Sequence, residues 1–204
     1  MDYITTREQL RGHYKEVGER AKAKEVAVLD RHCRTFLAHS PFVLIGSSDG
    51  NGNGDVTPKG DKPGFVAVLD DTTLAIPDRP GNNRLDTLEN ILLNPAVGLL
   101  FLIPGMDETL RVNGEARIAV DPSLRERFAV DGKAPATVMI VTVKTAYMHC
   151  AKAFMRSELW SPDTWPDRKS LPTLGAILKD HCALSASIDA TDQSLAEGYR
   201  KTMW

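Results

Sequence analysis

The stretch TLRVNGEARIAV, residues 109–120, alternates between apolar and polar side chains along its whole length. Leu110, Val112 and every second residue after them share one face, whereas Thr109, Arg111 and their alternates share the other. A period of two is typical of a β-strand with one buried face. Because the second face carries too many charges to be buried, these residues predict a strand with only its apolar face in the core.

Other short β segments surround this strand. The run DGNGNG, residues 49–54, needs positive φ at several positions, which predicts a hairpin loop. Further strands are expected at 42–46, 64–69, 72–77, 96–103 and 136–148. With roughly six strands and few helices between them, the order favours a closed antiparallel barrel over an alternating α/β sheet.

Helical spacing marks both ends of the chain and one short internal segment. The internal helix has an apolar face that includes Leu85 and Leu88, Asn94-Pro95 ends it, and Asn82 or Asn83 can cap its start. We therefore expect one domain over residues 1–204. Its N-terminal helices would span about 6–38, the barrel about 42–149, and a C-terminal helical segment about 150–204.

Composition excludes several classes of protein. The 25 Lys and Arg nearly balance the 27 Asp and Glu, so no basic field is present to collect nucleic acid or anionic lipid. The three cysteines lack C-x-x-C spacing, which argues against a disulfide framework and a structural zinc site. No run approaches the roughly 20 apolar residues that span a bilayer. We expect a cytoplasmic protein without a membrane segment.

Two polar stretches, VTPKGD at 56–61 and DRPGNNR at 78–84, predict an anion site. They place a hydroxyl, cations and amides where a strand ends and a helix begins. Free backbone N–H groups and the helix dipole attract anions there, and Lys59 could add a charge-assisted hydrogen bond. From spacing alone an alternative is equally open, in which Arg79 and Arg84 are surface residues paired with neighbouring carboxylates.

The chain resembles the pyridoxamine 5′-phosphate oxidase-related FMN-binding proteins. The segments that carry this resemblance are TPKGD at 57–61, LAIPDRPGNNRL at 74–85, NPAVGLLF at 94–101 and TLRVNGEA at 109–116. A subgroup of FMN-dependent enzymes of unassigned substrate is also similar at 149–153 and 156–160. The resemblance implies a six-stranded antiparallel split β-barrel with N-terminal and C-terminal helices, which holds FMN at a homodimer interface.

The same resemblance implies which residues hold FMN. The phosphate would lie against Lys59, Arg84 and nearby amides, and the ring along the strand that ends at Pro77. Thr109 or Arg111 could reach the flavin from either subunit. The implied FMN-binding residues are Thr57, Lys59, Gly60, Ile76, Pro77, Arg79, Asn82, Asn83, Arg84, Leu85, Thr109 and Arg111. Lys152 is a weaker candidate for a substrate pocket.

The implied function is that of an FMN-dependent oxidoreductase acting on a small molecule, with NAD(P)H as a possible reductant. The tryptophan- and arginine-rich end of the true oxidase is missing between Trp160 and Trp204, so pyridoxamine phosphate is not the expected substrate. A carrier or sensor of flavin or haem on the same scaffold remains the alternative, with His149 as the first haem ligand to test. The run from Asp49 matches half of a calcium loop, but Gly60 replaces its final glutamate, so no metal site is expected.

Overall fold

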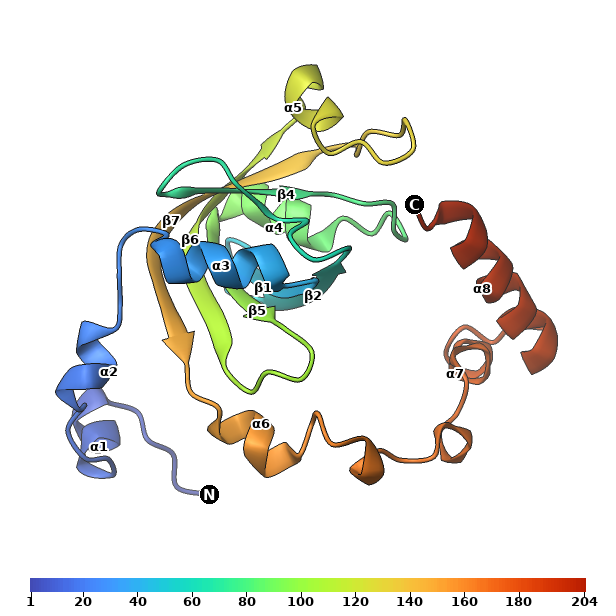
Figure 1. Ribbon diagram of the computed structural model, residues 1–204. Helices are drawn as coiled ribbons and strands as arrows, with labels where there is room; N and C mark the ends of the chain where they lie inside the picture. The colour runs from blue at the N-terminus through green and yellow to red at the C-terminus, as the bar shows by residue number, and fades with distance from the viewer.

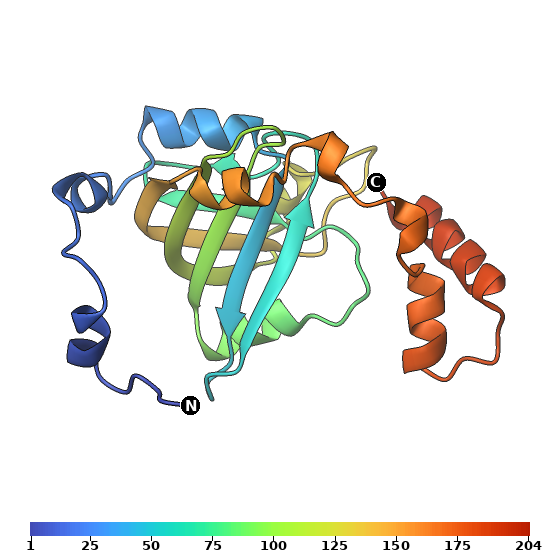
Figure 2. The same cartoon turned by 90° about the horizontal axis from the view of Figure 1, so that it is seen from below.

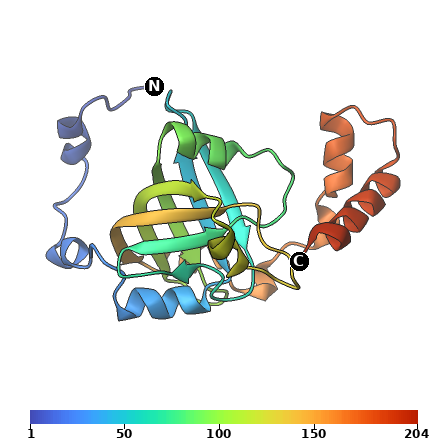
Figure 3. The ribbon, with the colours of Figure 1, turned by 90° about the horizontal axis from the view of Figure 1, so that it is seen from above.

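An antiparallel sheet of seven strands forms the body of the chain, and the computed structural model describes all of residues 1–204 (Figure 1). Its strand order is β2-β1-β5-β6-β7-β4-β3. The sheet curls strongly, as the view from above shows (Figure 3). The strands are β1 (Phe42–Ser48), β2 (Gly54–Gly60), β3 (Ala67–Val68), β4 (Thr73–Pro77), β5 (Ala96–Leu102), β6 (Thr109–Ala119) and β7 (Val138–His149).

The prediction of a mainly β chain with helices at both ends is confirmed, whereas its count of six strands in a closed barrel is corrected. The strand expected over 64–69 is reduced to the two residues of β3, which pairs with β4. The sheet does not close, because β2 and β3 are its two edges and no ladder joins them. Pro58 lies within β2 and has no N–H to donate, which suits it to an edge strand.

Eight α-helices accompany the sheet. Two of them, α7 and α8, form a hairpin that stands away from the strands (Figures 1 and 2). The helices are α1 (Arg7–Gly12), α2 (Glu19–Ala23), α3 (Arg31–His39), α4 (Asp86–Leu93), α5 (Pro122–Glu126), α6 (Lys152–Ser157), α7 (Leu174–His181) and α8 (Ile188–Thr202). No helix is long and apolar enough to cross a bilayer.

The core lies between α3 and the inner face of the sheet. Phe36 and Leu37 of α3 join Val43, Ile45 and other strand residues in one apolar cluster. The alternation along β6 is confirmed for its apolar face. The prediction for its polar face is wrong at the first residue, because Thr109 is buried and only 3% exposed.

The helix α4 begins differently from the prediction. Neither Asn82 nor Asn83 caps it; its N-cap is Leu85, which has the left-handed φ of 63° and offers no side-chain cap. The reason is local, because Asn82 Oδ1 accepts the Arg84 N–H at 3.1 Å instead.

A buried thiol on α3 should make stability depend on alkaline pH. Burial, followed by the hydrogen bond and charge of Asp30, raises the pKa of Cys33 from 9.0 to about 11. The folded state therefore holds this proton more tightly than the unfolded state. The contribution of Cys33 to the free energy of unfolding should be fully present below pH 9. It should decrease by about 2–3 kcal/mol as the pH rises from 9 to 11.

Urea unfolding of the wild type and of Cys33→Ala across this range measures the effect. Other groups titrate in both proteins, so the difference between their slopes isolates Cys33. Equal slopes in the two proteins would contradict the assignment.

Candidate functional site

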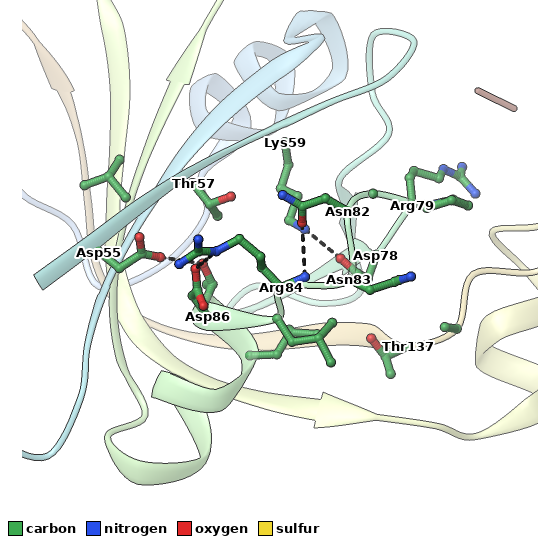
Figure 4. A pocket seen from close by; sticks show the side chains of 17 residues that line it. Asp55, Thr57, Lys59, Asp78, Arg79, Asn82, Asn83, Arg84, Asp86 and Thr137 are labelled. Atoms are coloured by element: carbon green, nitrogen blue, oxygen red, sulfur yellow. Dashed lines mark hydrogen bonds and ion pairs between the residues drawn. The ribbon is translucent and has the colours of Figure 1, made fainter. Parts of the chain in front are cut away.

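A cavity of about 670 Å³ lies between the edge strand β2 and the chain that runs from β4 into α4 (Figure 4). Asp55, Thr57 and Lys59 alternate along β2 and face it. Their register partners in β1 are Ser47, Ile45 and Val43, so the three residues lie on the core side of the sheet at its edge. The lining residues are Asp55, Val56, Thr57, Lys59, Asp78, Arg79, Pro80, Gly81, Asn82, Asn83, Arg84, Leu85, Asp86, Thr87, Leu88, Ala136 and Thr137.

Two ion pairs cross the gap between β2 and the end of β4. Lys59 Nζ lies 2.6 Å from Asp78 Oδ1, and Arg79 Nε lies 2.7 Å from Asp61 Oδ2. All four side chains are at most about a quarter exposed, so solvent screens them less than a surface pair. These contacts connect two parts of the sheet that no strand pairing joins.

The guanidinium of Arg79 points away from Lys59 and Arg84 (Figure 4). Besides Asp61 it donates to the carbonyl of Phe128 at 2.7 Å, and it lies 5.5 Å from the ring centre of Trp204. Its hydrogen-bonding capacity is therefore directed to the rim. Arg79 lines the cavity, whereas its charged end joins the end of β4 to the residue that follows β2, through the ion pair with Asp61.

Several donors at the cavity have no partner. No side chain caps α4, and the amides of Leu85, Asp86 and Thr87 donate no hydrogen bond. Thr137 Oγ1 is buried and is likewise unpaired. The three amides can bond to water or to a ligand, whereas Thr137 Oγ1 is fully buried and does not face the open cavity. Helix N-termini of this kind bind phosphate and carboxylate groups.

The loop before α4 has a strained backbone. Asn83 and Leu85 both lie in the left-handed region, with φ of 60° and 63°, although neither is glycine. A branched residue such as leucine disfavours this conformation, and strain of this kind gathers at ligand sites. The sign of φ alternates from Asn83 to Asp86, a backbone pattern found in anion-binding nests, but the Arg84 N–H is already donated to Asn82 Oδ1.

Carboxylates balance the cations around the cavity. Arg84 is 74% exposed on its side chain and pairs with Asp86 at 2.8 Å. This hydrogen bond and the nearby negative charges raise the pKa of Arg84. Asp55 accepts from Thr87 Oγ1 at 2.9 Å. The alternative of surface residues paired with carboxylates thus describes Arg84, whereas Arg79 pairs with Asp61 but is only 18% exposed.

The structure brings seven of the twelve predicted FMN-binding residues to one cavity. They are Thr57, Lys59, Arg79, Asn82, Asn83, Arg84 and Leu85. Gly60 faces the other side of β2, since exposure alternates along that strand. Ile76 and Pro77 are buried, with Ile76 packed in the core.

The remaining predicted residues lie elsewhere in this subunit. Thr109 is buried at the start of β6, and Arg111 donates to the hydroxyl of Tyr147 at 3.0 Å. Lys152 is exposed at the start of α6. None of the three lines the cavity.

Among the lining residues that were not predicted to bind FMN are Asp55, Thr87 and Thr137. Asp55 could have been found, because it lies two and four residues before Thr57 and Lys59 on the same face of a strand. Thr87 and Thr137 gave no signal, since their proximity comes from α4 and the approach to β7 meeting in space. No cluster of three His, Cys, Asp or Glu residues in the chain could hold a metal ion.

The fold and the cavity together define a class: a mainly β protein with a curled, open antiparallel sheet and a polar cavity beside its edge strand β2. The chain belongs to the pyridoxamine 5′-phosphate oxidase family, whose model matches residues 29–150. That match covers every strand of the sheet and the whole lining of the cavity. No curated protein matches the chain.

Solved structures of related shape are distant in sequence. HupZ from Group A Streptococcus is 16% identical, with 58% of this chain and 92% of that chain covered and a TM-score of 0.48. General stress protein 26 from Bacillus anthracis is 17% identical, with 56% and 88% covered and a TM-score of 0.43. A nimC/nimA family protein from Clostridium acetobutylicum is 18% identical, with 60% and 88% covered and a TM-score of 0.41. The family assignment therefore rests on residues 29–150 alone.

Proposed function

We propose that this chain binds FMN in the cavity between β2 and α4 and works as an FMN-dependent oxidoreductase on a small molecule other than pyridoxamine phosphate. The observation that carries the proposal is the group of three unpaired amides at the start of α4, whose residues line the cavity together with Lys59. Membership of the pyridoxamine 5′-phosphate oxidase family supports a flavin as the ligand.

The chain's own residues would divide the work of binding. Lys59 and the α4 amides would hold the phosphate, and Arg84, which is exposed, could turn from Asp86 toward it. Val56, Leu85 and Leu88 supply apolar surface at the same cavity for a flat ring. FMN when bound supplies hydride-transfer chemistry, with NAD(P)H as a candidate donor, while the protein orients the ring and excludes water.

A homodimer would complete this site, with the curled sheet as the split barrel of the family. The outer side of β2, β1 and β5 carries apolar residues, because Val43 and Ile45 point into the core and their neighbours point out. Two rows cross that side, formed by Pro58, Leu44 and Leu100 and by Val56, Gly46 and Gly98. Val56 also lines the cavity, so a second copy covering this side would lie at the cavity's rim and could bring Thr109 or Arg111 to it.

The outer side can be tested with two matched valines. Val56 and Val120 are 65% and 64% exposed, but only Val56 lies on the outer side of β2. A glutamate at position 56 would place a charge in the interface of both subunits, so Val56→Glu should weaken dimerisation about tenfold or more. Val120→Glu should leave it unchanged. Sedimentation at several concentrations measures both, and equal behaviour would remove the proposed interface.

The absorption spectrum of freshly purified protein tests the cofactor. We expect the absorption bands of oxidised flavin, at about one flavin per protein subunit. These bands should bleach when NADH or NADPH is added under nitrogen. If the bound flavin stays oxidised with every reductant, the chain binds flavin but is not an oxidoreductase. A haem spectrum, or failure to take up added FMN, would overturn the proposal.

A further inference from the structure

The carboxylate of Asp78 occupies the position that an anionic ligand of Lys59 would need. Asp78 Oδ1 lies 2.6 Å from Lys59 Nζ, within the cavity lining, and its side chain is 18% exposed. Its backbone is held in place, because the Asp78 N–H donates to the carbonyl of Thr137 at 3.0 Å. Lys59 is therefore already neutralised by a carboxylate that belongs to the protein.

We infer that Asp78 is an internal competitor for the anion site, which sets its affinity by holding Lys59 until a phosphate replaces it. This inference rests on the proposed function for the identity of the ligand, but its physical basis is the geometry of the pair. A phosphate monoester carries nearly two negative charges at neutral pH. If such a group contacts Lys59, its charge lies close to the fixed charge of Asp78, and the two repel each other.

The competition also connects ligand binding to the gap between β2 and the end of β4. Lys59 belongs to β2, whereas Asp78 follows the last residue of β4. Their ion pair is one of the two contacts that bridge these segments. When a ligand takes Lys59, the remaining bridge is Arg79 with Asp61. The cavity can then widen on the ligand's side while its rim stays connected.

Asp61→Asn is a matched control for Asp78→Asn. Both substitutions remove one negative charge and one ion pair across the same gap, from side chains of 20% and 18% exposure. They differ in one respect, since Arg79, the partner of Asp61, points away from the cavity (Figure 4). A general loosening of the gap or a change in net charge would affect both variants alike.

The experiment measures the dissociation constants of inorganic phosphate and FMN by calorimetry and by quenching of flavin fluorescence. Asp78→Asn should bind both ligands about tenfold more tightly than the wild type, whereas Asp61→Asn should stay within about twofold. Affinity that is unchanged or lower in Asp78→Asn, or equally raised in both variants, would overturn the inference. If phosphate binds tightly only to Asp78→Asn and FMN binds to neither protein, the competitor role stands and the FMN proposal fails.

A measurement on the unaltered protein guards against a variant that does not fold. Carboxylate ¹³C signals of aspartates are followed as inorganic phosphate is added to the full chain. The signal of Asp78 should move as it loses Lys59, and that of Asp61 should not. Saturation with phosphate without a change at Asp78 would also overturn the inference.

Discussion

A double variant, Lys59→Ala with Arg84→Ala, is expected to lose FMN almost completely while it keeps the fold. Each charge-assisted hydrogen bond to a phosphate contributes about 1.5–3 kcal/mol. Loss of two such bonds should weaken binding by about 10²–10⁴-fold. Lys59 and Arg84 line one side of the cavity, and neither belongs to the apolar core, so circular dichroism should stay unchanged. The flavin-to-protein ratio after gel filtration measures the loss.

Arg79→Ala is the informative control for this variant. Sequence alone places Arg79 with the phosphate ligands, but its guanidinium binds Asp61 and the Phe128 carbonyl at the rim. We expect Arg79→Ala to lower thermal stability and to change FMN affinity far less than the double variant. Full flavin content in the double variant would refute the phosphate site, and a greater loss in Arg79→Ala would move that site to the rim.

Gly114→Ala should be among the most destabilising single substitutions in the sheet. Gly114 lies at the irregularity where β6 shifts register against β7. An added Cβ would collide with the carbonyl oxygen of Thr142, and it would lie 3.1 Å from both the Thr142 carbonyl carbon and Val141 Cγ1. The obstacle is mainly backbone held in a ladder, which cannot move aside as a flexible side chain does. We expect a loss of about 3 kcal/mol and a fall in Tm of about 6–12 °C.

Gly46→Ala provides the comparison, because Gly46 also lies within a strand of the same sheet. A Cβ there would be 3.6 Å from the Gly98 carbonyl oxygen, an ordinary contact. Calorimetry of Gly46→Ala should show a change in Tm of a few degrees at most. A Gly114→Ala protein that melts with the wild type would mean that β6 and β7 are farther apart at this position.

Short-range pattern accounts for the parts of the site that the sequence predicted. Thr57 and Lys59 share a face because a strand has a period of two, and that period is visible without the fold. The DRPGNNR run breaks the strand and leads into a helix, which places Asn82, Asn83 and Arg84 at a helix start. Both stretches therefore carry their local geometry in their residue types.

The sequence does not predict which way a side chain turns when its partner lies far away in the chain. Arg79 and Arg84 lie in the same loop, yet Arg79 turns to Asp61 and Phe128 whereas Arg84 stays at the cavity. Ile76 belongs to the same motif but is buried in the core cluster that α3 forms with the inner face of the sheet. Such choices depend on which partner is nearest in space.

The amino-acid sequence by itself determined that this chain is mainly β with helical ends, and which two polar stretches would supply most of the cavity lining. Tertiary structure alone decided that the sheet stays open between β2 and β3, that Asp78 neutralises Lys59, and that Thr87 and Thr137 join the cavity lining. The physical reason is the range of each cause. Strand period and turn chemistry act between neighbours, whereas ion pairs and unpaired donors arise where segments distant in the chain meet.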